Sequence, residues 1–167
     1  MGTRKVTVGI LLAGVLLLGA SASNASDFDR AMEPILTEYL KIQTALAADG
    51  TEGVEGAIHT LEGLTKKLDP VTTSEKHTEH YKNIPADILA ACGRFNEAKE
   101  IRSMREAFKD LSKPISMWVA MAKPKGKSVM YCPMEKAGWV QDGTVVENPY
   151  FGPKMLGCGQ KVGGADY

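Results

Sequence analysis

The stretch from Asn96 to Trp118 reads NEAKEIRSMREAFKDLSKPISMW. Its apolar residues recur every three or four positions, which is the period of one face of an α-helix. These residues are Ile101, Met104, Phe108, Leu111, Ile115 and Trp118. The stretch therefore predicts an amphipathic helix that packs one face against a core. Pro114 falls inside the pattern, and we expect it to bend or divide the helix, because proline lacks the N–H that a helix interior uses.

Three further apolar stripes with the same period precede this stretch. The first begins near Asp27, Thr51 caps the second, and Ser74 is the expected N-cap of the third, where Pro85 introduces a kink or a restart. Four amphipathic helices joined by short connections predict an antiparallel four-helix bundle, here over residues 27–122.

The composition changes near residue 123, where the chain becomes rich in glycine and proline. Within the tail, residues 128–162, Ser128 to Tyr131 predict a short strand. Gln141-Asp142-Gly143, between two short β-prone segments at 139–140 and 144–146, predicts a hairpin turn. The expected fold class is mainly α: a four-helix bundle with a C-terminal Gly/Pro-rich tail that contains a short β-hairpin and packs on the bundle.

The first residues have the three parts of an export signal. Arg4 and Lys5 are followed by an apolar run from Val6 to Leu18 and then by small residues. The run is shorter than the roughly 20 residues that span a bilayer. We therefore expect a signal peptide over residues 1–22, cleaved near Ala22 or Ala25, and no membrane span after cleavage.

The charge balance excludes one class of partner. The 167 residues carry 20 basic and 20 acidic side chains, and loss of Arg4 and Lys5 with the signal leaves a net charge of −2. Nucleic-acid binding needs clustered lysine and arginine, and no basic run occurs after the signal. Nucleic acid is therefore not an expected partner.

Two short sulfur motifs in the tail point to chemistry. Cys132-Pro133-Met134 and the run from Met155 to Cys158 each place a thiol within three residues of a thioether. Soft sulfur ligands select Cu(I) and, by extension, Ag(I). Cys132 and Cys158 are the candidate principal ligands, and Met134 and Met155 the candidate secondary ligands, with Met130 as a further option.

A disulfide between Cys132 and Cys158 is the alternative, and the spacing alone favours it. It would close a loop of 26 residues and stabilise the fold by about 3 kcal/mol. Export would place the thiols in a compartment that permits disulfides. The two states do not exclude each other, because a reduced pair binds metal and an oxidised pair does not.

The other reactive residues are weaker candidates. Cys92 lies among small residues of the third stripe and is expected to be a buried packing residue. His77 and His80 share a helical face, which is typical of solvated surface. The chain contains no HExxH motif, phosphate loop or paired CxxC, so neither a zinc site nor catalysis is expected.

Several segments together resemble a known family. They are the run Arg105 to Ser112, Tyr131-Cys132-Pro133-Met134, Gly138-Trp139, and the run Asn148 to Gly159. Over Ile35 to Val162 the chain resembles domain of unknown function 3347, a family of exported bacterial domains. These are found alone or attached to periplasmic adaptor subunits of copper and silver efflux systems. The resemblance implies a helical bundle with a Cys/Met-bearing tail, a periplasmic location and a role near metal resistance.

Two functional hypotheses follow. The first is a periplasmic protein that binds Cu(I) or Ag(I), and sequesters the ion or delivers it to an efflux partner. The second is a disulfide-stabilised interaction module without metal, whose tail presents Trp139, Tyr150 and Phe151 to a protein partner. These aromatics are also interpretable as the local core of the tail. A thiol oxidoreductase is a third, weaker hypothesis, because the two tail cysteines lack the CxxC spacing.

Overall fold

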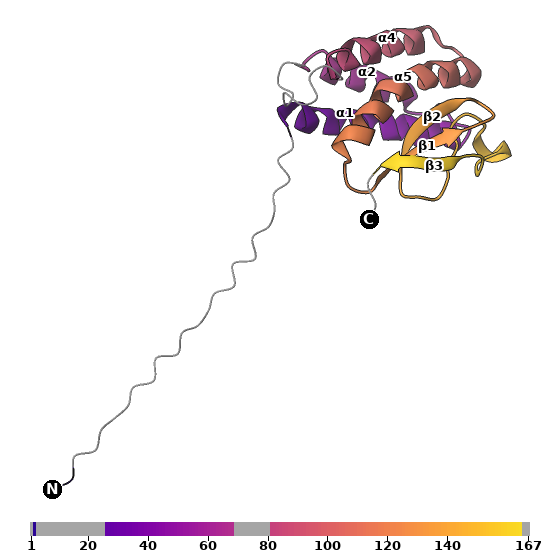
Figure 1. The fold of residues 1–167 in the computed structure, drawn as a ribbon. Coiled ribbons are helices and arrows are strands. Elements are labelled where there is room, and N and C mark those ends of the chain that lie inside the picture. The colour runs from indigo at the N-terminus through magenta and orange to yellow at the C-terminus, as the bar shows by residue number, and fades with distance from the viewer. Residues whose placement is uncertain (1, 3–25, 69–80, 165–167) are drawn as a thin grey trace.

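The computed structural model describes residues 2, 26–68 and 81–164. It is mainly helical, with a small antiparallel sheet formed by the C-terminal part of the chain (Figure 1). The predicted signal cleavage sites lie outside the described residues, as do Ser74, His77 and His80.

The described ranges contain four α-helices: α1 Asp27–Ala47, α2 Val54–Thr65, α4 Ile84–Glu97 and α5 Ile101–Ala122. α1 begins at a capping box, in which the Ser26 hydroxyl accepts the Asp29 N–H at 3.1 Å. Pro85 lies in the first turn of α4, so it marks the start of that helix, where a missing N–H costs no intrahelical bond.

Pro114 does not divide the last helix, so of the two expected effects, a bend or a division, the division is wrong. α5 runs without interruption from Ile101 to Ala122, and Pro114 is itself buried. Leu111 and Ile115, on either side of the proline, are both fully buried. Burial of one continuous apolar face therefore outweighs the single hydrogen bond that proline removes.

The helices pack in chain order, and the sheet lies against the first and the last of them. α1 contacts α2, α2 contacts α4, and α4 contacts α5. β2 (Ala137–Asp142) packs on both α5 and α1 (Figure 1). The core is therefore shared between helices and sheet, and Trp118 and Trp139, one from each part, are both fully buried.

The sheet has three strands in the order β2-β1-β3, with β1 at Lys127–Cys132 and β3 at Gln160–Gly164. The predicted strand at 128–131 is confirmed as β1. The predicted hairpin is misplaced, because β2 pairs back onto β1 through a turn at 133–136. Residues 144–146 form no strand, and Val145 is 79% exposed.

A side chain explains why the chain after β2 does not form a strand. The buried Gln141 amide donates to the Val145 carbonyl and accepts the Glu147 N–H at 3.0 Å. Its oxygen also accepts the Trp139 indole N–H at 2.9 Å. One glutamine thus occupies backbone groups that a neighbouring strand would otherwise bond.

A buried tyrosine joins the helices to the sheet. The Tyr39 hydroxyl lies 2.8 Å from the Ser112 hydroxyl and accepts the Val140 N–H at 3.0 Å. Its ring stacks on Phe108 of α5, with centroids 4.9 Å apart. Burial raises the pKa of the Tyr39 phenol well above its usual value, so the hydroxyl stays protonated.

None of the helices in the described ranges has the combination of length and apolar character that a membrane crossing requires.

Candidate functional site

One face of α5 holds the tail of the protein against the helices. Arg105, Phe108 and Ser112 follow one another at intervals of three and four residues, so they share a face of α5. Phe108 contacts the ring of Tyr150 with centroids 6.0 Å apart, and Ser112 meets Tyr39. The tail therefore packs against the run Arg105 to Ser112, which is the helical segment that carries the family resemblance.

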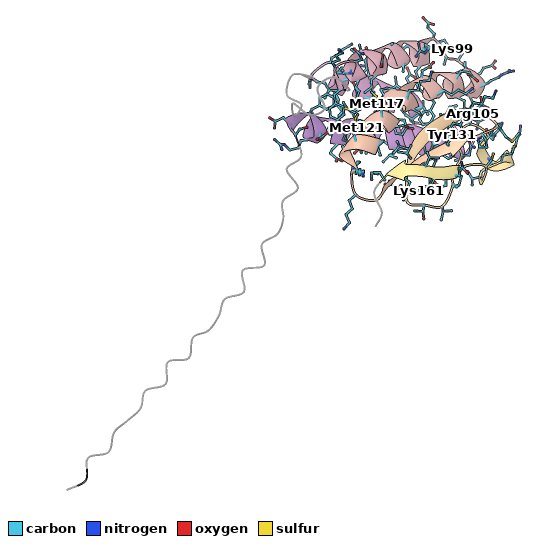
Figure 2. All side chains as sticks on the ribbon, in the orientation of Figure 1. Lys99, Arg105, Met117, Met121, Tyr131 and Lys161 are labelled. Carbon is cyan, nitrogen blue, oxygen red and sulfur yellow. The ribbon has the colours of Figure 1, made fainter. Side chains whose placement is uncertain are left out.

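Arg105, which is labelled in Figure 2, binds three residues at once. Its guanidinium donates to the Leu46 carbonyl at 2.9 Å, to Asp49 Oδ1 at 2.8 Å and to the Pro149 carbonyl at 2.8 Å. The end of α1, the start of α5 and the loop after residue 147 are thereby fixed together. Gly152, with φ +58°, leaves room for this guanidinium, since a Cβ there would lie 2.8 Å from Nη2.

Asn148 shapes the loop that carries the second tail cysteine. This residue is fully buried, and its side-chain amide donates to the Cys158 carbonyl. Its backbone N–H donates to the Leu156 carbonyl at 2.8 Å, and its side-chain oxygen accepts the Tyr150 N–H at 2.8 Å. The loop is therefore closed on itself by one asparagine, which holds the backbone of Cys158 two residues before β3 begins.

The two tail cysteines lie side by side. Cys132 is the last residue of β1 and is fully buried, whereas Cys158 is partly exposed on the loop. Their Sγ atoms are 3.6 Å apart, and both are free thiols. The structure thus brings together the two principal ligands that the sequence motifs predict, from positions 26 residues apart.

The surroundings of the pair differ between the two sulfurs. Cys132 Sγ accepts the Glu135 backbone N–H at 3.5 Å, within the turn that follows β1. The hydrogen bond to Cys132, together with burial, raises the pKa of the Cys158 thiol. Lys109 of α5 forms an ion pair with Glu135 and so ties this turn to the helices.

The methionines of the two motifs are placed differently from the thiols. Met134 lies in the β1–β2 turn and is 62% exposed, and Met155 is partly buried at the end of the 3₁₀ turn Gly152–Lys154. Met130 is fully buried in β1. Among the described residues, no hydrogen-bond contact joins a methionine sulfur to either thiol, and no group of three or more His, Cys, Asp or Glu side chains is arranged to hold a metal ion.

The third cysteine, and the histidine that falls within residues 26–68, are separate from this pair. Cys92 is fully buried in α4, which confirms its predicted packing role, and burial raises the pKa of its thiol to about 11. His59 is exposed on α2. Neither contributes to the thiol pair.

The tail aromatics form local core. Trp139 is fully buried, Tyr150 is 5% exposed, and their rings meet edge to face with centroids 5.9 Å apart. This confirms the interpretation of Trp139 and Tyr150 as local core, and the alternative that the tail presents these two rings to a partner is wrong. Phe151 alone of the three stays partly exposed.

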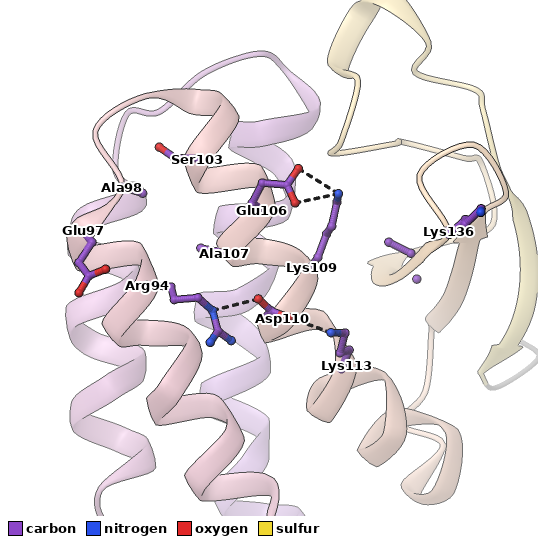
Figure 3. Close-up of a pocket in the computed structure, with 12 residues that line it drawn as sticks. Arg94, Glu97, Ala98, Ser103, Glu106, Ala107, Lys109, Asp110, Lys113 and Lys136 are labelled. Atoms are coloured by element: carbon purple, nitrogen blue, oxygen red, sulfur yellow. Dashed lines mark hydrogen bonds and ion pairs between the residues drawn. The ribbon is translucent and has the colours of Figure 1, made fainter.

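A charged groove of about 620 Å³ runs beside the turn that follows Cys132 (Figure 3). It lies between α4, α5 and the first residues of β2. Arg94 pairs with Asp110 at 2.9 Å across it, and Lys109 pairs with Glu106 at 2.9 Å. Its charged walls are thus largely paired with one another.

Sequence reasoning missed the residues that position the thiols. Arg105 and Asn148 stand in the segments that carry the family resemblance, but their roles depend on contacts across 44 and 10 residues. The i, i+3, i+7 spacing of Arg105, Phe108 and Ser112 was the available signal, since a polar residue at each end of an apolar face indicates bonding partners outside the helix.

Comparison with known proteins gives one match. A family model described as "Protein of unknown function (DUF3347)" matches residues 35–127. The match begins inside α1 and ends at the first residue of β1, so both tail cysteines lie beyond it. No curated protein and no solved structure shows significant similarity to the chain.

Proposed function

The chain belongs to the family described as "Protein of unknown function (DUF3347)", and from the chemistry of its own residues we propose that it binds a soft metal ion, Cu(I) or Ag(I), in the periplasm. It sequesters the ion or passes it to a metal-efflux partner, such as a periplasmic adaptor subunit. It binds the ion and does not catalyse a reaction. The helices, as an antiparallel four-helix bundle, are the scaffold for the Gly/Pro-rich tail.

The observation that carries this proposal is the 3.6 Å contact between the Cys132 and Cys158 thiols. Two thiolates held this close suit a soft monovalent ion, which accepts two sulfur ligands. Metal binding displaces the thiol protons, so the ion takes the place of the present sulfur–sulfur hydrogen bond. Met134, exposed beside Cys132, and Met155, three residues before Cys158, are available as secondary ligands.

Competition titration of the reduced protein with Cu(I) against a chromophoric chelator tests the proposal. We expect one tightly bound ion, and loss of that binding in a Cys132→Ser, Cys158→Ser double variant. Cys92→Ala is the matched control, because it removes a buried cysteine from α4 and should leave the affinity unchanged. An unchanged affinity in the double variant rejects the ligand assignment.

The same contact supports a second function, a disulfide-stabilised interaction module. Two free thiols at 3.6 Å need only a small movement to form a bond. In that case the partner would meet the exposed surface of the tail and not Trp139 or Tyr150. Counting free thiols in protein taken from its native compartment separates the two functions: three indicate the metal site, and one indicates the module.

A further inference from the structure

The Cys132–Cys158 pair is accessible from one side only. Cys132 is fully buried at the end of β1, whereas Cys158 is partly exposed on the loop before β3. Thiol–disulfide exchange needs a direct approach of the incoming sulfur to the sulfur that it attacks. A small molecule from solvent therefore meets Cys158 before it meets Cys132.

The loop around Cys158 holds its sulfur against its partner. The buried Asn148 side chain donates to the Cys158 carbonyl, and the Cys158 N–H donates to the Met155 carbonyl at 2.9 Å. On the other side, Gly159 packs against the Trp139 ring so closely that a Cβ would lie 2.6 Å from it. Cys158 is thus fixed at the surface with its sulfur aimed at Cys132.

Cys132 has the features of a resolving thiol. Its sulfur lies within 3.6 Å of the Cys158 sulfur, and the Glu135 N–H points at it from 3.5 Å. A backbone donor stabilises a sulfur that carries negative charge, as an attacking or a departing thiolate does. Cys92, which is equally buried, has no second cysteine in contact and cannot act in this way.

We propose that Cys158 is the site at which low-molecular-weight disulfides and thiols exchange with this protein, and that Cys132 resolves the mixed disulfide. In the oxidising direction, the Cys158 thiolate attacks a disulfide RSSR, forms Cys158–S–S–R and releases RS⁻. The Cys132 thiolate then attacks Cys158 Sγ, forms the intramolecular disulfide and releases a second RS⁻. The protein loses two electrons and RSSR gains them.

The reverse sequence reduces the pair. A small thiolate attacks the accessible Cys158 Sγ, and Cys132 departs as the thiolate beside the Glu135 N–H. A second thiolate then releases Cys158 and leaves RSSR as product. If the proposed soft-metal function is correct, this exchange determines whether the ion can bind, because only the reduced pair offers two thiolates.

Trapping of mixed disulfides tests the exchange route. The reduced Cys132→Ser and Cys158→Ser variants are each incubated with glutathione disulfide, quenched with acid and mapped by peptide mass spectrometry. In Cys132→Ser we expect an adduct on Cys158 that forms on the order of tenfold faster than the adduct on Cys132 in Cys158→Ser. Cys92 should remain unmodified in both. Equal rates, or faster modification of Cys132, overturn the proposal.

Two further measurements separate the proposed exchange route from misfolding of a variant and from the proposed metal binding. In denaturant the difference between the variants should vanish, because access is then equal; a difference that persists there contradicts the role of burial. In the unmodified reduced protein, early quenching should show glutathione on Cys158, and glutathione on Cys132 overturns the proposal. Failure of Cu(I) binding with Cys158 selectivity intact counts against the metal function alone.

Discussion

The three cysteines show how far surroundings determine the behaviour of one side chain. Cys92 is buried in α4, Cys132 is the last residue of β1, and Cys158 is partly exposed on the loop before β3. The sequence separates the first from the other two by its neighbours, since small apolar residues flank Cys92 while proline, glycine and methionine flank the pair. Contact between Cys132 and Cys158 makes those two the candidates for chemistry.

Cys92 gives a prediction about stability at high pH. Its pKa rises from 9.0 to about 11 in the folded state because burial disfavours the thiolate. Between these values the unfolded chain has lost the proton that the folded chain retains, so stability falls as pH rises. From pH 9 to pH 11 we expect Cys92 to lower the free energy of unfolding by up to about 2 kcal/mol.

Urea unfolding of the wild type and of Cys92→Ala at several pH values measures this effect. The variant should lose less stability than the wild type over the alkaline range, whatever its stability at neutral pH. Parallel pH curves for the two proteins would show that the Cys92 thiol does not titrate differently in the folded state.

Among the secondary-structure elements, the strands of the tail depend on side-chain hydrogen bonds to the backbone. Gln141 bonds the backbone of residues 145 and 147, so the chain leaves the sheet after β2 and does not turn back as the predicted hairpin. β3 was not predicted, because it ends in Gly163-Gly164, which have low strand propensity, and it is held by backbone pairing with β1.

The two glycines that flank Cys158 provide a matched pair of variants. Gly159 has φ +152° and a Cβ there would lie 2.6 Å from the buried Trp139 ring, whereas a Cβ at Gly157 would meet nothing within 4 Å. We expect Gly159→Ala to destabilise the protein by about 1 kcal/mol or more and to weaken Cu(I) binding, because Cys158 must move with the loop.

Gly157→Ala should leave the stability and the Cu(I) affinity close to those of the wild type. Thermal unfolding measures the stability, and the competition titration measures the affinity. Equal Cu(I) affinities in the two variants would show that the position of Cys158 does not control metal binding.

At the scale of the whole molecule, the tail and the helices form a common core. Arg105 strengthens the contact between the tail and the helices through hydrogen bonds to α1, to Asp49 and to the Pro149 carbonyl. Its side chain is only 15% exposed, so these bonds are largely shielded from water. The helical family segment and the cysteine tail are thereby linked in one structure.

Replacement of Arg105 by alanine should weaken the contact between the tail and the helices. Loss of the guanidinium leaves partly buried carbonyls without donors, and we expect a loss of stability of about 2 kcal/mol. Arg102→Ala, on the exposed face of the same helix, is the control and should cost little. Denaturant unfolding measures both, and equal effects would contradict the role assigned to Arg105.

Apolar periodicity predicted most of the helical part, because the period of buried residues follows directly from helix geometry. α1, α2 and α5 overlap the stripe that begins near Asp27, the stripe that follows Thr51 and the stripe that contains Phe108. Division of the helix at Pro114, one of the two expected effects, was wrong because tertiary burial overrides a local preference. Contact between Cys132 and Cys158 followed from two similar motifs, but Arg105 and Asn148 act through contacts that spacing does not encode.

X-ray absorption spectroscopy of the reduced protein loaded with one equivalent of Cu(I) tests the proposed metal site, since the spectrum identifies the atoms bound to the ion. We expect the bound ion to have sulfur neighbours alone, and we expect these to be lost when Cys132 and Cys158 are both replaced by serine and kept when Cys92 is replaced by alanine. A shell of nitrogen or oxygen, or an unchanged spectrum in the double serine variant, would contradict the proposed metal site.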